Sequence, residues 1–406
     1  MKHRYRLLVA LLLAVIWPGF TNPPARTAAT VWQMGDLFAG VGRANVLRGE
    51  YIVFTSGGTW KEELQNRFAG PKTTTTGCFV APPEAGGALY TTGFASLAVM
   101  RFDSAPPHDP RTVTTIDSPG VDAVQSIAFD TAGNYYLGTL PPARKSALDP
   151  IPPYAYILKY SPANVLLAAY DVPTGMRGAN WIDLGSDEQT LYYTSEDTTI
   201  HIYRPGQWAT YRELVITDGG APIAGTIYGI RVLPPVPGDP STPSGFLVAS
   251  SKGLLRLDSA ARVRLRYNAP VSGKASTFAV NITPDGQSVW TATFQDNLDS
   301  KRSATAGELV RFHIPTGAVT AGPISTGAPN VWGLCLKDEY TAAANVCHAV
   351  DAAGSPVVDS LTGEPRTTPC RIPEYCDNGI DDDGDGLGDA ADADCLAPRL
   401  DNRPRR

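Results

Sequence analysis

The stretch NVWGLCLKD, at residues 330–338, reads as an apolar strand, yet no further strands of the same sheet follow it. Near the other end of the chain, GDLFAGVG at residues 35–42 resembles the second strand of a sheet whose first strand is missing. We therefore expect the C-terminal stretch to pair with the N-terminal one and to complete its sheet. Pairing of this kind closes a ring of sheets and leaves only short, protected strand edges.

A short repeat lies between these two stretches and indicates what the ring contains. In each copy, apolar residues lead into an aromatic residue or a leucine and then into a turn. The six copies are YIVFTSG (51–57), VMRFDSA (99–105), ILKYSPA (157–163), IHIYRPG (200–206), LLRLDSA (254–260) and LVRFHIP (309–315). Their spacing of roughly 43 to 58 residues is typical of the blades of a propeller.

Upstream of these copies, the sequence has the pattern of β-hairpins. Examples are SIAFDTAGNYYLGT (126–139), WIDLGSDEQTLYYTSED (181–197) and FAVNITPDGQSVWTAT (278–293). Apolar alternation, a turn of Asp, Gly or Asn and a second strand rich in Tyr together predict a hairpin. We therefore predict an all-β fold: a six-bladed β-propeller of four-stranded blades at residues 30–340, closed by pairing of its N- and C-terminal strands.

The first residues have the pattern of a secretory signal peptide. The basic residues Lys2, His3, Arg4 and Arg6 precede an apolar run from Leu7 to Trp17. This run is too short to span a bilayer, and the alternative is a retained amphipathic anchor. We predict that residues 1–29 are a signal peptide and leader. The mature chain is expected to be secreted, periplasmic or at the cell surface, with no transmembrane segment.

The charge of the chain bears on its partners. The formal net charge is −6, and the sequence has no polybasic run. Because nucleic-acid binding depends on clustered Lys and Arg, nucleic acid is not expected as a partner. For an exported propeller we expect an extracellular protein or a carbohydrate as the partner, and we expect a monomer.

Six cysteines in an exported chain predict disulfide bonds, although six cysteines allow fifteen pairings. Alignment of the strands places Cys78 and Cys335 on innermost strands of neighbouring blades, offset by one residue. Since alternate residues of a strand face opposite ways, this offset can turn the two sulfurs toward each other. Two buried free thiols are the alternative. The predicted pairs are Cys78–Cys335, Cys347–Cys370 within a linker at residues 341–373, and Cys376–Cys395.

The stretch CDNGIDDDGDGLGDAADADC, at residues 376–395, has the spacing of a twelve-residue calcium loop. The predicted ligands are Asp381, Asp383, Asp385, the backbone carbonyl of Leu387, Asp389 and Asp392, with Gly386 at the sharp turn. A bound Ca²⁺ offsets the repulsion between these carboxylates, and a solvated acidic tail is the alternative. We predict a disulfide-braced calcium loop at residues 374–396 and a disordered tail at residues 397–406.

Two resemblances follow from these motifs. The stretch from Glu374 to Cys395 resembles the short metal-binding repeat of secreted bacterial surface proteins. The blade spacing of residues 30–340 resembles secreted bacterial six-bladed propellers of the NHL-repeat and gluconolactonase-like superfamily. The second resemblance implies a divalent cation in the central channel, held by Glu, Asn and Asp side chains. The candidates are Asn180, Asp183 and Asn330, although no Glu begins an innermost strand.

Propeller ligands bind where the innermost strands begin, at the mouth of the central channel. The residues expected there are Gln125, Ser126, Asn180, Trp181, Thr226, Tyr228, Thr277, Phe278, Asn330 and Trp332. We predict ligand contacts for Asn180, Trp181, Tyr228, Phe278, Asn330 and Trp332. The aromatic side chains form either a stacking platform for sugars or a packed plug.

These observations favour an exported binding or scaffold module with a calcium-binding tail. The alternative is a hydrolase or lyase of the gluconolactonase-like class that holds a divalent cation in its channel. No catalytic residue is assigned, because the sequence has neither an H-E-x-x-H nor a G-x-S-x-G motif and its histidines are scattered.

Overall fold

The structure is a computed structural model that describes residues 30–370 with internal gaps. The gaps are residues 42–48, 67–74, 83–85, 94–96, 143–153, 237–238, 269–275, 294–306, 329, 352–354, 361 and 363–364. The predicted leader (1–29) and the predicted calcium loop and tail (374–406) lie outside the described residues. Within the described part of the chain, no helix has the length and apolar character needed to cross a membrane.

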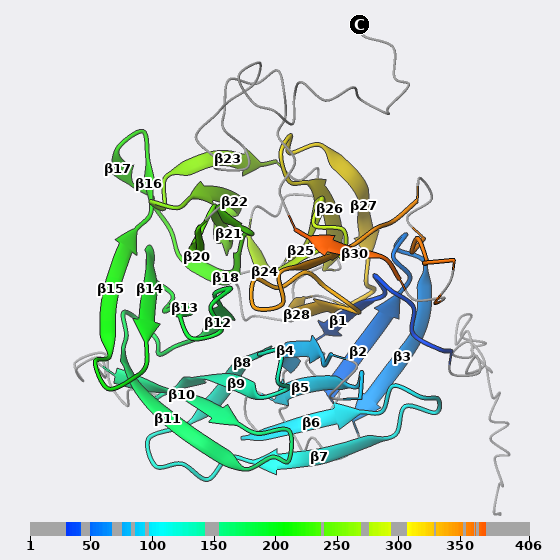
Figure 1. Cartoon of the computed structure of the whole chain (residues 1–406), viewed down its shortest axis with the longest axis horizontal. Coiled ribbons are helices and arrows are strands. Elements are labelled where there is room, and N and C mark those ends of the chain that lie inside the picture. The colour runs from blue at the N-terminus through cyan, green and yellow to red at the C-terminus, as the bar shows by residue number, and fades with distance from the viewer. Residues whose placement is uncertain are drawn as a thin grey trace, which may run out of the picture.

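Six four-stranded antiparallel sheets form a six-bladed β-propeller (Figure 1). From the innermost strand outward, the sheets are blade 1, β28 (Val331–Leu336), β1 (Leu37–Val41), β2 (Gly49–Phe54) and β3 (Trp60–Asn66); blade 2, β4 (Thr75–Val80), β5 (Leu89–Gly93), β6 (Ala98–Phe102) and β7 (Pro110–Thr115); blade 3, β8 (Ala123–Phe129), β9 (Tyr135–Leu140), β10 (Tyr154–Tyr160) and β11 (Leu166–Pro173); blade 4, β12 (Trp181–Leu184), β13 (Leu191–Thr194), β14 (Thr199–Arg204) and β15 (Thr210–Val215); blade 5, β18 (Ile227–Val232), β21 (Gly245–Ser250), β22 (Gly253–Asp258) and β23 (Val263–Tyr267); and blade 6, β24 (Thr277–Ile282), β25 (Ser288–Thr293), β26 (Glu308–His313) and β27 (Val319–Ser325).

Three further sheets of two strands each are separate from the six blades. They are β16 (Thr217–Asp218) with β17 (Ala221–Pro222), β19 (Pro235–Val236) with β20 (Asp239–Pro243), and β29 (Val346–His348) with β30 (Thr367–Pro369).

The predicted closure of the ring is confirmed. Strand β28 pairs antiparallel with β1, with Cys335 opposite Phe38 and Leu336 opposite Leu37. Strand β28 is thus the innermost strand of blade 1, and β1, β2 and β3 from the N-terminal part of the chain are its other three strands. The six copies of the repeat form the third strand of each blade, namely β2, β6, β10, β14, β22 and β26.

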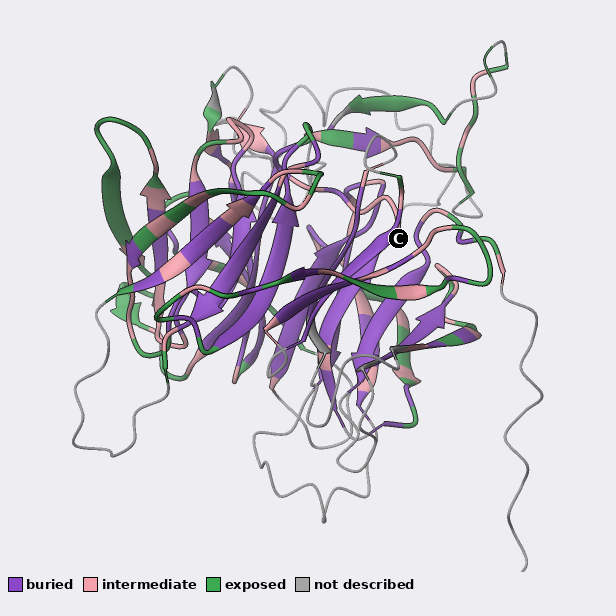
Figure 2. Cartoon of the chain, turned by 90° about the horizontal axis from the view of Figure 1, so that it is seen from below, coloured by how far each residue is buried: buried purple, intermediate pink, exposed green. Residues whose placement is uncertain are grey.

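Burial decreases from the axis to the rim of the propeller (Figure 2). Every residue of β8, β18 and β24 is buried, whereas half of the residues of β11 and most of those of β15 are exposed. An innermost strand has another blade against each face, so both sets of its alternating side chains are removed from water. This explains why β8, β18 and β24 are buried at every residue rather than at alternate ones.

Two glycines allow the innermost parts of neighbouring blades to approach closely. A Cβ on Gly77 of β4 would lie 2.7 Å from the backbone oxygen of Gln125 in β8. A Cβ on Gly138 of β9 would lie 2.4 Å from Ser126 Oγ and 2.5 Å from the backbone oxygen of Ala179. Glycine is therefore required where blades 2, 3 and 4 meet near the axis.

Both of the predicted disulfide pairs that fall within the described residues are present. Cys78 of β4 is bonded to Cys335 of β28, with their Cα atoms 5.7 Å apart. This bond joins the innermost strands of blades 1 and 2. Cys347 is bonded to Cys370, with their Cα atoms 4.9 Å apart. The third predicted pair, Cys376–Cys395, lies outside the described residues.

The segment predicted as a linker is packed onto blade 6 over the described residues 341–370. Tyr340 forms a β-bridge with Ile282, and the backbone N–H of His348 donates to the carbonyl of Pro284 at 2.8 Å. Figure 1 shows β30 lying over blade 6. The extension covers the end of the propeller at which the innermost strands finish, because Ile282 is the last residue of β24.

Candidate ligand site in the central channel

The innermost strands β28, β4, β8, β12, β18 and β24 contact one another in ring order and enclose the central channel. We call the end at Asn180, Thr226, Ser276 and Asn330 the strand-start end, and the end at Leu184, Val232, Ile282 and Leu336 the strand-finish end.

Irregularities in strand pairing recur near the strand-start end. The register between the innermost strand and its neighbour shifts at Gln125 in β8, at Phe278 in β24 and at Trp332 in β28. Strands β4 and β18 have similar shifts next to Gly77 and Tyr228. A β-bulge bends its strand and re-aims a side chain that regular alternation would send between the blades. The bulges explain why these side chains gather at the axis.

Trp181, Tyr228, Phe278 and Trp332 form an axial aromatic cluster. The centroid of the Phe278 ring lies 5.2 Å from that of Trp181, 5.0 Å from that of Tyr228 and 5.5 Å from that of Trp332. Trp181 belongs to blade 4 and Phe278 to blade 6, so these rings meet inside the channel in front of blade 5. Trp181, Tyr228 and Phe278 are only 7%, 6% and 4% exposed. The cluster is therefore a packed plug along blades 4 to 6, not an open stacking platform.

Blades 3 and 4 contribute polar groups instead of a continuous aromatic wall. Gln125 Oε1, Ser126 Oγ, Asn180 Oδ1 and Trp181 Nε1 are buried and have no hydrogen-bond partner among the described residues. We call these four groups the polar arc. Buried polar atoms in proteins almost always have a partner, so four unsatisfied atoms on β8, on β12 and on the residue just before β12 are unusual. The arc offers two amide oxygens as acceptors, one indole N–H as a donor and one hydroxyl that does both.

Glu196 holds Asn180, one member of the polar arc, and was not predicted from the sequence. Its Oε1 accepts a hydrogen bond from Asn180 Nδ2 at 2.7 Å, and Arg177 Nη1 lies 3.2 Å from the same oxygen. Glu196 stands in the turn after β13 with a left-handed φ of 54°. The resemblance to gluconolactonase-like propellers implies a Glu near the start of an innermost strand. Glu196 instead reaches Asn180 from the turn between the second and third strands of blade 4.

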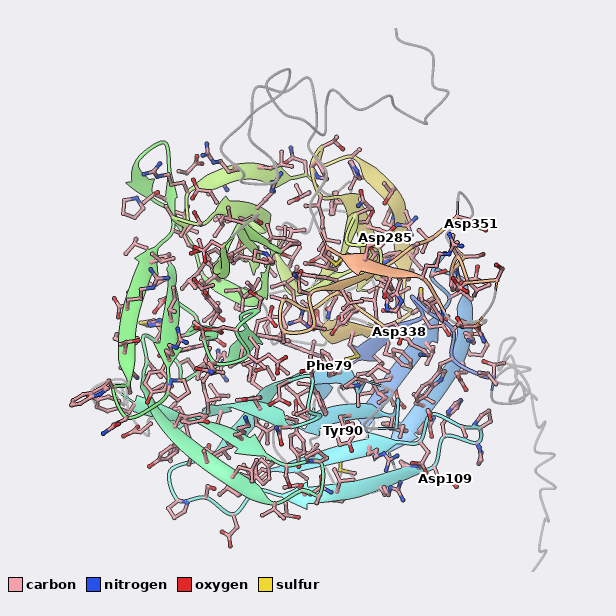
Figure 3. The ribbon with its side chains drawn as sticks, viewed as in Figure 1. Phe79, Tyr90, Asp109, Asp285, Asp338 and Asp351 are labelled. Atoms are coloured by element: carbon pink, nitrogen blue, oxygen red, sulfur yellow. A yellow bond between two sulfur atoms is a disulfide. The ribbon has the colours of Figure 1, made fainter. Side chains whose placement is uncertain are left out.

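The strand-finish end of the channel is closed by the residues that follow β28. Tyr340 and Ala342 are buried in the core shared by blades 4 to 6, and Ala343 is buried against blade 3 and blade 4 residues such as Tyr136 and Ile182. Residues 339–343 therefore cross the channel from blade 1 to blades 3 and 4. In Figure 3, Asp338 lies on the inner side of the ring at the start of this crossing, and Asp351 lies nearer the rim.

A buried ionic cluster fastens this crossing segment. Arg231 Nη2 of blade 5 lies 3.3 Å from Glu339 Oε1, and Asn281 Nδ2 of blade 6 donates to Glu339 Oε2. Burial raises the pKa of Glu339 to about 7, while Arg231 and Asn281 act in the opposite direction. Burial likewise raises the pKa of Asp183, against the lowering effect of Arg231 and of the Val232 N–H. The strand-finish end of the channel is therefore covered by residues 339–343.

The three residues considered for a channel cation are held in separate surroundings. Asn180 bonds Glu196, whereas Asp183 Oδ2 accepts a hydrogen bond from Val232 N at 2.8 Å near the strand-finish end. Asn330 stands at the start of blade 1 and is 9% exposed. Within the described ranges, no three His, Cys, Asp or Glu residues are arranged to hold a metal ion. The ligands predicted for Ca²⁺, Asp381 to Asp392, lie outside those ranges.

Comparison with solved structures supports the fold through one match. No protein-family model matches the sequence, and no curated protein matches it. A protein of unknown function from Bacteroides caccae superposes with a TM-score of 0.52 at 14% identity, over 74% of this chain and 98% of that protein. A gluconolactonase from Xanthomonas campestris gives a TM-score of 0.44 at 14% identity, over 67% of this chain and 91% of that enzyme. A luciferin-regenerating enzyme gives 0.46 at 11% identity, over 74% of this chain and 96% of that enzyme. At such low identity, the first of these matches shows the fold alone, and the other two, with TM-scores below 0.5, carry no argument.

Proposed function

We propose that this chain is an exported β-propeller that binds a small, neutral, hydroxylated ligand of the carbohydrate class at the strand-start end of its channel. The observation that carries this proposal is the polar arc, whose four buried hydrogen-bonding atoms have no partner among the described residues. The two disulfides are compatible with an oxidising, extracytoplasmic compartment.

The chemistry of the channel fits a carbohydrate better than an ion. The arc combines acceptors and donors but no formal charge, which suits hydroxyl groups that both donate and accept. Of the aromatic cluster beside the arc, only Trp332 is partly exposed, so Trp332 is the ring that can offer an apolar surface to the C–H face of a sugar. Blades 3 and 4 would bind the hydroxyls while blade 1 contacts the ring.

A panel of neutral methyl glycopyranosides, titrated into the protein by calorimetry, tests this proposal. At least one glycoside is expected to bind saturably. Trp181→Phe, which removes the indole N–H but keeps an aromatic ring, is expected to weaken that binding about fivefold, since one hydrogen bond contributes about 1 kcal/mol. Trp60→Phe on the outer strand β3 is the control, because Trp60 is 45% exposed and far from the axis.

Two results would contradict the proposal: no saturable binding by any glycoside, or equal binding by the Trp181→Phe and Trp60→Phe variants. Hydrolysis of a sugar lactone that requires an added divalent cation would instead support the gluconolactonase-like alternative.

We also propose that the C-terminal loop binds one Ca²⁺ through Asp381, Asp383, Asp385, Leu387, Asp389 and Asp392. The support is the ligand spacing of the sequence. Calorimetric titration of the full chain with Ca²⁺ is expected to show one site that is lost in Asp385→Asn. Asp382→Asn, which removes the same charge at a position that is not a ligand, is expected to retain the site. Equal effects of the two substitutions would indicate a solvated acidic tail.

A further inference from the structure

Asn180 is fixed at its backbone and at one end of its side-chain amide. Its backbone N–H donates to the carbonyl of Thr194 at 3.0 Å, and its Nδ2 donates to Glu196 Oε1 at 2.7 Å. The residue is 0% exposed. The remaining side-chain atom, Oδ1, has no partner in the part of the chain that the structure describes. One hydrogen-bonding group of Asn180 is therefore left for a ligand.

Glu196 is itself held in place by the loop that precedes β12. Arg177 Nη1 lies 3.2 Å from Glu196 Oε1 and 3.3 Å from Oε2. The hydroxyl of Ser195 accepts hydrogen bonds from the backbone N–H groups of Gly175 and Arg177, at 2.9 and 3.2 Å. The left-handed backbone of Glu196 has an energetic cost for a residue with a Cβ. The loop before β12 and the turn at Ser195 and Glu196 are thus bonded to each other, and these bonds maintain the left-handed conformation of Glu196.

The carboxylate of Glu196 determines which end of the Asn180 amide it faces. A carboxylate only accepts hydrogen bonds, so the NH₂ group must point toward it and Oδ1 must point away. A neutral amide at position 196 would remove this restriction, because an amide group both donates and accepts. The orientation of Asn180 therefore depends on the charge of residue 196 and not only on its shape.

We propose that Glu196 is a positioning residue that makes Asn180 a hydrogen-bond acceptor, so that the bound ligand must carry a hydrogen-bond donor at this position. A sugar hydroxyl meets this requirement, whereas an ether oxygen or a fluorine does not. This inference rests on the proposed function, because it assigns the hydrogen-bond polarity of the same site.

The first test needs no ligand and compares Glu196→Gln with Glu188→Gln by ¹⁵N NMR of side-chain amides. Glu188 is a matched control: it also has a left-handed φ, 52°, and lies in blade 4, but it bonds Thr131 near the strand-finish end. The Asn180 resonances, identified by their loss in Asn180→Asp, are expected to shift and broaden in Glu196→Gln as the amide rotates. They are expected to stay unchanged in Glu188→Gln. Unmoved Asn180 resonances in Glu196→Gln would overturn the inference whatever the binding results.

The second test measures the donor requirement with methyl β-D-glucopyranoside and its monodeoxyfluoro analogues, in which fluorine replaces one hydroxyl at a time. In the unaltered protein, one replacement is expected to weaken binding at least about tenfold, because it leaves Asn180 Oδ1 without a donor. In Glu196→Gln this penalty is expected to shrink to roughly threefold or less, since the rotated amide no longer requires a donor. A merely structural role would weaken all the analogues equally.

The outcomes separate this inference from the proposed function. If the glucoside binds but Glu196→Gln keeps the full fluorine penalty, the inference is wrong and the carbohydrate site stands. If neither this glucoside nor any other glycoside of the panel binds, the carbohydrate site fails, and the donor requirement fails with it.

Discussion

His108 is buried against Trp32, and each of its ring nitrogens faces an acceptor. Nδ1 lies 2.8 Å from the carbonyl of Asp103, and Nε2 lies 3.0 Å from the carbonyl of Thr30 and 3.4 Å from Glu62 Oε1. Only the imidazolium form can donate from both nitrogens. The Trp32 ring stacks on it at 4.2 Å. His108 therefore fastens the segment that begins at Thr30 to blades 1 and 2 as a cation.

The hydrogen bonds of His108 predict a pH-dependent contribution to stability. Burial lowers the pKa of His108, but hydrogen bonds to Glu62, Asp103 and Thr30 outweigh burial and raise the pKa above its ordinary value of 6.5. The folded chain then holds this proton more tightly than the unfolded chain. The resulting stabilisation is complete below the unfolded pKa and is lost as pH rises through the folded pKa. His108→Asn is expected to lower the free energy of unfolding more at about pH 5.5 than at about pH 8.5 in urea denaturation. Equal losses at both pH values would contradict the imidazolium assignment.

Glu339 predicts a second pH effect at the strand-finish end of the channel. Its pKa is about 7 in the folded chain, against an ordinary value of 4.5. Between these values the folded chain keeps a proton that the unfolded chain has lost. Stability is therefore expected to fall as pH rises through this window, by up to roughly 1.4 kcal/mol per pH unit. Glu339→Gln should remove this slope, as measured by the difference between the two urea-denaturation profiles. Parallel profiles would show that Glu339 does not titrate there.

At the scale of the element, the innermost strands must meet two structural requirements that conflict. They must pack tightly against neighbouring blades, which requires glycine at Gly77 and Gly138, and they must turn side chains such as Gln125 and Phe278 toward the axis. The β-bulges allow both, because a local shift in register changes the direction of one side chain while the rest of the strand stays paired. The proposed ligand site thus combines strand residues such as Gln125 with Asn180, which directly precedes β12, and Glu196, which stands in a turn.

Gly77→Ala tests the tight approach of β4 and β8. The added Cβ would lie 2.7 Å from both the backbone oxygen of Gln125 and the Cα of Ser126, so β8 itself would have to move. We expect a loss of roughly 1–3 kcal/mol in urea denaturation. Glycoside binding should weaken as well, because β8 carries two groups of the polar arc. Gly57→Ala is the control, since its Cβ would meet only Thr55 Oγ1 at 3.9 Å. If the two variants were equally stable, the close approach would not be a constraint.

At the scale of the whole molecule, closure of the ring depends on two kinds of bond at the joint, by which we mean the contacts of β28 with blades 1 and 2. Strand β28 pairs with β1 inside blade 1, and the Cys78–Cys335 disulfide ties β28 to blade 2. This disulfide spans 257 residues, whereas Cys347–Cys370 spans 23 and lies in the extension. A bond that closes a longer loop removes more conformational entropy from the unfolded chain.

Removal of each disulfide is therefore expected to have different consequences. Cys78→Ala with Cys335→Ala should lower the free energy of unfolding by up to about 5 kcal/mol, and Cys347→Ala with Cys370→Ala by up to roughly 3 kcal/mol. Thermal and urea denaturation of the two double variants measure the difference. A larger loss for the second pair would mean that the extension, not the joint, holds the ring together.

The sequence predicted the architecture because its repeat is dictated by local chemistry. A copy such as LLRLDSA needs only apolar alternation and a turn to specify a third strand, and the missing partner of GDLFAGVG is visible without coordinates. The one-residue offset of Cys78 and Cys335 could be predicted as well, because it follows from aligning the strand patterns of neighbouring blades. Neither the role of Glu196 nor the crossing of the channel by residues 339–343 has such a local pattern.

The sequence by itself determined that six similar sheets form a ring, that the stretch around Trp332 completes the first sheet, and which cysteines join there. Only the tertiary structure decided that Trp181 and Phe278 meet inside the channel, that Glu196 orients Asn180, and that Glu339 helps to close the far end. The physical reason is that strand formation and pairing follow the two-residue period of the chain. Contacts around the axis depend instead on bulges, left-handed turns and the approach of non-neighbouring blades, and these have no period in the sequence.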